Sequence, residues 1–256
     1  MTAAAPPLLV EGLAAGYGKQ ARVLDGIDLV VESGHIVGLL GLNGAGKTTL
    51  LKSILDFIPL EAGGIALFGV GHRHKAARRN LAYLPEQFMP SPQLTGWEFL
   101  SLSLGYYGLR LARDRARDIG RHFGLDDAVL ARRVTSYSKG MGQKLGLIAT
   151  LLLDRPLLLL DEPMSGLDPL ARARLKEALL AQRARGHSVF LSSHILADID
   201  ALCDRIAVIH DGTLRYDGTT QGLKAAEGED ELERAFLRRL GATPGGSAPA
   251  PLLAAE

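Results

Sequence analysis

The chain has 256 residues, which is enough for one large domain or two small ones with a well-buried core. Its 29 Lys and Arg residues nearly balance 28 Asp and Glu residues, and the formal net charge of +1 gives no reason to expect nucleic acid or an acidic membrane as a partner. Because Cys203 is the single cysteine, an internal disulfide is excluded, and neither a membrane-length apolar run nor a signal peptide is evident, so we expect a soluble cytoplasmic protein.

Short strands and one helix are predicted in the first part of the chain. Apolar or alternating runs predict strands at residues 8–10, 27–31, 35–40 and 65–68. The run at 35–40 leads into a glycine-rich loop, which opens a helix from about Lys47 to Leu55. A further apolar run, LAYLPE, ends at Pro85-Glu86.

The pattern turns helical between residues 88 and 154. Thr95 and Glu98 stand three residues apart ahead of an apolar run, which is the sequence of a capping box. Helical segments are also expected at about 111–123 and 141–153, so this stretch predicts a helical insert within an α/β domain. The arginines between 110 and 121 alternate with aspartates, which is typical of an exposed, salt-bridged face and not of nucleic-acid binding.

Strands and helices alternate again from residue 157. The segment LLLLDE predicts a buried strand, a helix is expected at 169–185, and a second strand at 188–193. A hairpin is expected at 205–218, with Asp211-Gly212 at its turn. The alternation indicates a parallel core with antiparallel additions at its beginning and end.

The C-terminal residues are predicted to form a separate unit. The segment 229–240 predicts a plain surface helix with Leu232, Phe236 and Leu240 on one face, and disorder is expected after Gly241. We therefore expect one domain over residues 1–225, followed by a C-terminal helix and tail over 226–256. Within that domain, the core covers about 5–87 and 155–225, and the helical subdomain about 88–154.

The most specific motif is GLNGAGKT, from Gly41 to Thr48, which fits the phosphate-loop pattern G-x-x-x-x-G-K-[ST]. A chain of this length would match the pattern by chance roughly once in a hundred. Gly44 and Gly46 allow backbone N–H groups to surround phosphate oxygens without Cβ clashes. Lys47 can contact the β- and γ-phosphates, and the Thr48 hydroxyl can bind Mg²⁺.

Two carboxylates follow the strand predicted in LLLLDE. Asp161 and Glu162 would lie at the carboxyl edge of the sheet, where ligands of open α/β sheets bind. Acidic residues at the end of a strand are commonplace alone, but a phosphate loop in the same chain favours a functional role. Asp161 can hold magnesium, through water, and Glu162 can accept a proton from an attacking water molecule.

Ser138–Gly142 place a hydroxyl, a cation and two glycines where a helix is predicted to begin. A serine N-cap explains the hydroxyl, but each interior glycine costs about 0.5–1 kcal/mol relative to alanine. A helix start with little side-chain bulk and free N–H groups suits an anion close to the backbone. Asp168-Pro169 has the ordinary sequence of an N-cap, and His194 after a strand is by itself more often structural.

Together and in this order, these motifs resemble the ATP-binding subunit of ATP-binding cassette (ABC) transporters, over roughly residues 8–218. The resemblance implies a P-loop NTPase (RecA-like) core with N-terminal antiparallel strands and a helical insert. It also implies that Glu162 is the catalytic carboxylate, that His194 is the switch histidine near the γ-phosphate, and that 165–168 spans a dimer. Ser138–Gly142 match the family signature, which closes over the γ-phosphate of ATP held by a second subunit.

The resemblance assigns further residues to ATP and magnesium. The residues implied to contact ATP are Tyr17 (stacked on adenine), Gly41, Leu42, Asn43, Gly44, Ala45, Gly46, Lys47, Thr48, Thr49, Ser138, Lys139, Gly140 and Asp168. The residues implied at magnesium are Thr48, Asp161 and either Glu86 or Gln87, because the family's glutamine aligns with Glu86 and Gln87 follows it.

The signature Ser138-Lys139-Gly140-Met141 resembles the exporter branch called ABC-2 type, although that branch usually has a basic residue where this chain has Gly142. The implied protein is an ATPase on the inner face of the cell membrane, paired with an identical or related ATPase subunit. It would drive transmembrane permease subunits on a separate chain.

Three other interpretations were weighed against this one. A soluble ABC ATPase acting on a macromolecular complex is disfavoured, since such proteins usually carry two cassettes or a long coiled-coil insert. A P-loop nucleotide kinase lacks an evident acceptor site. His72-x-His74 could suggest a metal site, but a solvated loop is expected, because no further cluster of ligands accompanies the pair.

Overall fold

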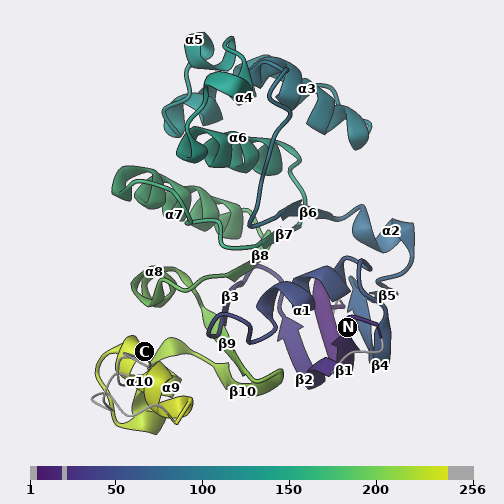
Figure 1. The fold of residues 1–256 in the computed structure, drawn as a ribbon, viewed down its shortest axis with the longest axis vertical. Helices are drawn as coiled ribbons and strands as arrows, with labels where there is room; N and C mark the ends of the chain where they lie inside the picture. Colours follow the sequence, from purple (N-terminus) through teal and green to yellow (C-terminus); the bar gives the residue numbers. More distant parts are fainter. Residues whose placement is uncertain (1–4, 19–21, 242–256) are drawn as a thin grey trace, which may run out of the picture.

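The computed structural model describes residues 5–18 and 22–241, so the disorder expected after Gly241 lies outside the described residues. Two sheets and their helices form the molecule, with the helical insert at one end and the C-terminal helices at the other (Figure 1). Within the described ranges, no helix is both long enough and apolar enough to cross a membrane.

The first sheet is antiparallel and has the strand order β2-β1-β4-β5. Its strands are β1 (Leu8–Gly16), β2 (Arg22–Val31), β4 (Leu60–Leu67) and β5 (Val70–Gly71). The first three extend beyond the predicted runs because register shifts along β1 interrupt the strict alternation on which the prediction depends. This sheet supplies the antiparallel addition expected at the beginning of the chain.

The second sheet has the order β10-β9-β3-β8-β7-β6 and is parallel from β6 to β9. Its strands are β3 (Ile36–Leu40), β6 (Leu81–Leu84), β7 (Leu157–Leu160), β8 (Ser188–Ser192), β9 (Arg205–His210) and β10 (Thr213–Gly218). The hairpin of β9 and β10 is confirmed, with positive φ at both Asp211 and Gly212, as a primed turn requires. The carboxyl ends of the parallel strands meet at one edge.

The core lies on both faces of this second sheet. Leu157 and Leu159 of β7 belong to a cluster shared with the antiparallel sheet and the helix α1 (Lys47–Ile54). Leu158 and Leu160 face the opposite cluster, which contains the helical insert. An all-apolar run is required here because successive side chains of a strand point to opposite, equally buried faces.

The helical insert is confirmed, and it contains α3 (Gly96–Tyr106), α4 (Arg113–His122), α5 (Asp127–Leu130), the 3₁₀ turn η1 (Val134–Ser136) and α6 (Lys139–Leu152). The predicted capping box is present, because Glu98 N donates to Thr95 Oγ1 at 3.2 Å and Thr95 N donates to Glu98 Oε2 at 2.8 Å. Arg117 pairs with Asp114 at 3.0 Å and Asp127 at 2.9 Å, which confirms the salt-bridged face.

The remaining helices are α2 (Lys75–Arg78), α7 (Pro169–Ala184), α8 (Leu196–Leu202), α9 (Thr220–Glu227) and α10 (Leu232–Arg239). The surface helix expected at 229–240 is present as α10, and its apolar face, with Leu232 and Phe236, is buried in the core that contains α6 and β7. Helix α10 packs against α9 and α8, neither of which was predicted. The boundary predicted after residue 225 falls inside α9 and stays a prediction.

The solvated loop predicted for His72-x-His74 is wrong for His72, which is buried with Nδ1 3.2 Å from the Ile65 carbonyl oxygen. His74 is exposed. Across the part of the chain that the structure describes, no group of three or more His, Cys, Asp or Glu side chains is arranged to hold a metal ion. His72 therefore packs as a buried residue of the β5–α2 connection.

Candidate active site

The loop between β3 and α1 carries the phosphate-loop pattern. Gly46, the residue before α1, has φ of 110°, a conformation that favours glycine, and a Cβ there would displace the end of the Leu24 side chain, whose Cδ2 would lie 2.6 Å away. Lys47 is buried, and its Nζ donates to the carbonyl oxygens of Gly41 at 2.8 Å and Leu42 at 3.3 Å. The lysine ammonium is thereby held against the loop, as a phosphate-binding lysine must be.

A cavity of about 330 Å³ joins this loop to two carboxylates from other strands. It is lined by Asn43, Gly44, residues 46–49, Glu86 and Glu162. Gly41 and Leu42 line a neighbouring cavity, whereas Ala45 is buried beneath the loop with its N–H donating to the Leu42 carbonyl oxygen. Of the two magnesium candidates after β6, Glu86 lines both cavities and Gln87 lines neither.

Asp161 is buried immediately after β7. Its Oδ1 accepts a hydrogen bond from Ser192 Oγ at 2.6 Å, while Oδ2 is buried and has no hydrogen-bond partner among the residues that the structure describes. A buried carboxylate oxygen with no partner is costly, and a cation would satisfy it. Burial, together with the negative charges of Asp161 and Glu86, raises the pKa of Tyr83 to about 12, so this phenol stays neutral beside them.

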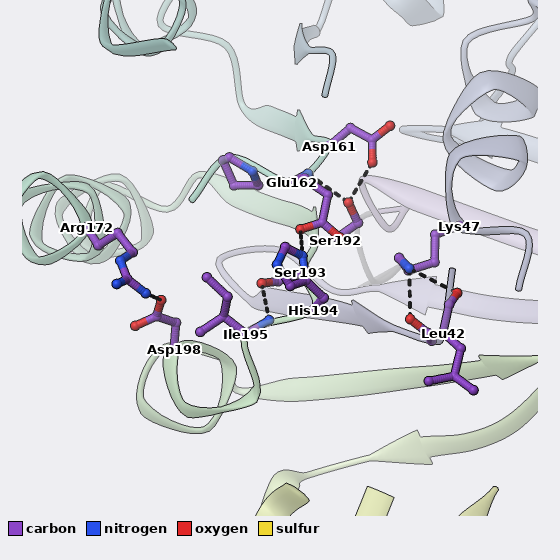
Figure 2. Close-up of polar contacts among 12 residues, drawn as sticks. Leu42, Lys47, Asp161, Glu162, Arg172, Ser192, Ser193, His194, Ile195 and Asp198 are labelled. Atoms are coloured by element: carbon purple, nitrogen blue, oxygen red, sulfur yellow. Dashed lines mark hydrogen bonds and ion pairs between the residues drawn. The ribbon is translucent and has the colours of Figure 1, made fainter. Parts of the chain in front are cut away.

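Glu162 adopts a backbone conformation that is unusual for a residue with a side chain, with φ of 49°. Its N–H donates to Ser192 Oγ at 2.8 Å, and its Oε2 lies 2.7 Å from Nδ1 of His194 (Figure 2). Since an ionised carboxylate can only accept, Nδ1 carries the proton in this contact. Positive φ costs about 1–2 kcal/mol at a non-glycine residue and is found preferentially at functional sites.

A second cavity of about 340 Å³ continues from the first, with Asn43, Glu86 and Glu162 common to both. The remaining lining residues are Leu40, Gly41, Leu42, Ser165, Ser193, His194, Leu196 and Phe236. Sequence reasoning found His194 but missed Ser192, although the two serines before His194 at the end of β8 were a usable signal. It also missed Phe236, which no local pattern connects to this site.

The residues at the start of α6 lie elsewhere. Ser138 caps the helix, accepting from Met141 N at 3.2 Å, and a Cβ at Gly140 would lie 2.9 Å from the Gly166 carbonyl oxygen. Ser138, Lys139 and Gly140 line neither of the two cavities. Gly140 therefore has a packing role that the sequence did not reveal, namely the close approach of residues 165–168 to α6.

Asp168 is the N-cap of α7, as predicted, and its Oδ1 accepts from Ala171 N at 2.8 Å. Its Oδ2 pairs with Lys144 of α6 at 3.0 Å. The Ala171 N–H, and after it Lys144, holds the pKa of the Asp168 carboxyl below its usual value. Asp168 thus belongs with the α6 residues and not with the cavities.

Tyr17 directly follows β1, and its side chain lies close to the phosphate loop. Its side chain is half-exposed, and its hydroxyl lies 3.4 Å from Thr49 Oγ1. The ring therefore stands at the rim of the loop with a face available for contact.

The sequence and the fold are similar to those of known proteins. A family model described as ABC transporter matches residues 24–165. An ABC transporter ATP-binding protein of Nostoc sp. is 38% identical over 247 residues, covering 90% of this chain and 73% of the relative. A Nod factor export ATP-binding protein of Ralstonia nicotianae is 37% identical over 214 residues, covering 81% of this chain and 65% of the relative.

A solved ATP-binding subunit of an ABC transporter superposes with a TM-score of 0.85 at 35% identity, covering 91% of this chain and 98% of that chain. This likeness confirms the expected fold class, an α/β P-loop NTPase core with antiparallel additions and a helical insert.

Proposed function

Since this chain belongs to the ABC transporter family as one of its ATP-binding, ATP-hydrolysing subunits, we propose that it powers export through permease subunits on a separate chain. Two features support export: the Ser-Lys-Gly-Met form of the signature, and the relative named for Nod factor export. The chain would then act at the inner, cytoplasmic face of the membrane, held there by the permease. Met89 and Tyr106, which are exposed apolar side chains at the edge of the helical insert, suit such contact.

The substrate is ATP, with its phosphates in the cavity lined by the phosphate loop. Backbone N–H groups of the loop and the Lys47 ammonium would bind the phosphate oxygens, and Tyr17 would stack on adenine. The unpartnered Oδ2 of Asp161 and the hydroxyl of Thr48 fit magnesium, with Glu86 favoured over Gln87 as the third residue. Magnesium would neutralise charge on the β- and γ-phosphates.

One observation carries the proposed hydrolysis: a single cavity joins Glu162 to the phosphate loop, while His194 contacts one oxygen of that carboxylate. The Nδ1–H of His194 occupies Oε2, so Oε1 remains free to accept a proton from the attacking water. Ser192 fixes the base from behind, because its Oγ bonds to the Glu162 N–H and to the Asp161 carboxylate. Water, base and phosphate would thereby be aligned.

A second copy completes the site in this proposal. The Ser138 oxygen accepts the cap bond with a lone pair, so its O–H can still donate to a γ-phosphate. Because Ser138–Gly140 line neither cavity of their own chain, the phosphate they meet would be bound by the partner. Two identical or related subunits, packed head to tail about a two-fold axis, would satisfy both halves of the site.

Purification of the tagged full-length chain from detergent-solubilised membranes tests the transport role. We expect a membrane protein with several hydrophobic spans to co-purify in fixed proportion. Ribosomal RNA or a soluble complex in its place would overturn the transport role and favour the macromolecular alternative.

The paired arrangement is tested separately by light scattering on the Glu162→Gln protein with Mg-ATP. The molecular mass is expected to double with nucleotide, and it should not change in Glu162→Gln/Lys47→Ala, which keeps the same base substitution but loses the phosphate lysine. A Glu162→Gln chain that stays monomeric at saturating nucleotide would contradict the proposal.

A further inference from the structure

The C-terminal helix α10 reaches the second cavity, which shares Asn43, Glu86 and Glu162 with the cavity in which hydrolysis is proposed. Phe236 is only 5% exposed and lines this cavity together with Glu162, Ser165 and His194. Leu196, the first residue of α8, lines the same cavity. An aromatic side chain from the end of the chain therefore forms one wall beside the switch histidine.

The position of His194 is set mainly by its backbone. The imidazole is 59% exposed and makes its contact with Glu162 alone among the contacts drawn in Figure 2. Two hydrogen bonds hold the loop that bears His194. Ile195 N donates to Ser193 Oγ at 3.0 Å, and Ser193 N donates to the Leu39 carbonyl oxygen at 3.3 Å. A side chain held at one atom follows its loop, so whatever holds this loop also positions the imidazole.

Helix α8, which continues from this loop, depends on its neighbours. It has seven residues and no side-chain N-cap bond, and a helix that short is stable only through packing. On one side, Asp198 pairs with Arg172 at 3.6 Å (Figure 2) and with Lys176 at 3.0 Å, both from α7. On the other side, Asp200 pairs with Lys224 of α9, and α10 packs against α8.

Helix α10 is itself fixed at its C-terminal end. Arg239 pairs with Glu227 at 2.7 Å, and its guanidinium lies 5.4 Å from the ring centroid of Tyr216 in β10. Arg238 pairs with Glu229 at 2.7 Å. The strand β10 and the helices α9 and α10 thus form a continuous support next to α8 (Figure 1). Within this support, Phe236 of α10 lines the cavity.

We propose that Phe236 is a positioning residue for His194: it lines the same cavity as His194 and Leu196, on a helix that packs against α8, and it keeps the switch loop where the imidazole meets Glu162. This inference rests on the proposed roles of Glu162 and His194. It makes the C-terminal helix part of the hydrolytic machinery, although the helix supplies no group that touches ATP. Displacing α10 would slow hydrolysis without releasing nucleotide.

The test compares Phe236→Ala with Leu237→Ala in the full-length chain. Leu237 is the adjacent residue of α10 and packs, half-buried, against the same core, but it does not line the cavity. We expect Phe236→Ala to lower kcat about 10-fold, since a shift of about 1 Å in a catalytic group can cost up to about 10²-fold. KM for ATP should stay near the wild-type value, Leu237→Ala should keep the wild-type kcat, and Phe236→Leu should restore most of it.

The His194 imidazole resonances, followed by NMR, separate positioning from a general loss of stability. They should move in Phe236→Ala and not in Leu237→Ala. Wild-type kcat with unmoved His194 resonances in Phe236→Ala would overturn the inference, as would equal losses of kcat in both variants.

If Phe236→Ala does not fold, Arg239→Gln tests the same inference with a residue outside the cavity. This change removes the contacts of Arg239 with Glu227 and Tyr216, which hold the C-terminal end of α10. A smaller fall in kcat with the same resonance shift would support the inference, and an unchanged kcat would overturn it. Glu162→Gln measured in parallel distinguishes the two levels: a Glu162→Gln protein with wild-type hydrolysis contradicts the proposed function, not merely the role of Phe236.

Discussion

The phosphate-loop edge of the sheet and the N-terminus of α6 differ in how much of their chemistry one chain assembles. At the sheet edge, the loop after β3 and Glu86 after β6 share a cavity with Glu162. Ser192 of β8 donates to the Asp161 carboxylate and accepts from the Glu162 N–H. At α6, Ser138 caps its own helix and Gly140 lies against residues 165–168, and neither lines the cavity.

The difference follows from the two kinds of element. Parallel strands bring their carboxyl ends to one edge, so side chains distant in sequence converge on a ligand without help. A helix N-terminus offers N–H groups and a partial positive charge but gathers no side chains from other elements, so it needs a ligand carried to it. In a head-to-tail pair, the sheet edge of one chain would meet the α6 N-terminus of the other.

The largest expected effect is at the sheet edge. Glu162→Gln should keep ATP binding, but its hydrolysis rate should fall about 10²- to 10⁴-fold, the usual contribution of a general base. Phosphate release and a nucleotide titration measure the two properties. Glu177→Gln, at an exposed glutamate of α7, is the matched control and should hydrolyse ATP normally. Wild-type hydrolysis by Glu162→Gln would remove Glu162 from this role.

A mixing experiment addresses the α6 half directly. Ser138→Ala should lower hydrolysis about 10- to 100-fold, the usual value of a hydrogen bond to a charged group, and Lys47→Ala should abolish it. Mixed dimers of the two variants contain one composite site with both residues intact, so equal mixing should restore about a quarter of the wild-type rate. No recovery would mean that Ser138 acts within its own chain, as a cap alone.

His72 lies outside both the sheet edge and the start of α6, and its burial affects how stability depends on pH. Burial lowers the pKa of its imidazole, even with the Asp56 carboxylate 3.8 Å from Nε2, so the unfolded chain takes up a proton first as the pH falls below 6.5. The free energy of unfolding should therefore fall on acidification. Urea unfolding at about pH 5–7 should show a shallower pH dependence in His72→Gln than in wild type, whereas exposed His74→Gln keeps the wild-type slope. Equal slopes in all three proteins would contradict the assignment.

The smallest effect concerns the ion pair between α6 and the N-cap residue of α7. Lys144→Met removes the partner of Asp168, and because this carboxylate is exposed, the loss of stability should be small and should shrink further in 1 M salt. Urea midpoints at low and high salt measure it. Arg121→Met breaks a more exposed pair within α4, 3.9 Å from Asp118, and should show less. A loss that is independent of salt would indicate packing of the Lys144 chain as the cause.

Local sequence patterns predicted those parts of the fold and of the site that depend on neighbouring residues. The phosphate loop needs glycines and a lysine at fixed spacing, the capping box needs Thr95 and Glu98 three apart, and the hairpin needs Asp211-Gly212. Each is defined by neighbouring residues, and the structure has the loop, the box and the hairpin where the sequence placed them. The all-apolar sequence of β7 likewise predicts a strand that is buried on both faces.

Contacts between distant residues were decided only by the tertiary structure. The pairing of Ser192 with Asp161 follows from β7 and β8 lying side by side, and the choice of Glu86 over Gln87 at the cavity follows from how β6 ends. Phe236 looked like one apolar residue of a surface helix because its amphipathic pattern says that a face is buried but not against what. The sequence determines which residues can do the chemistry, and long-range packing determines which of them meet.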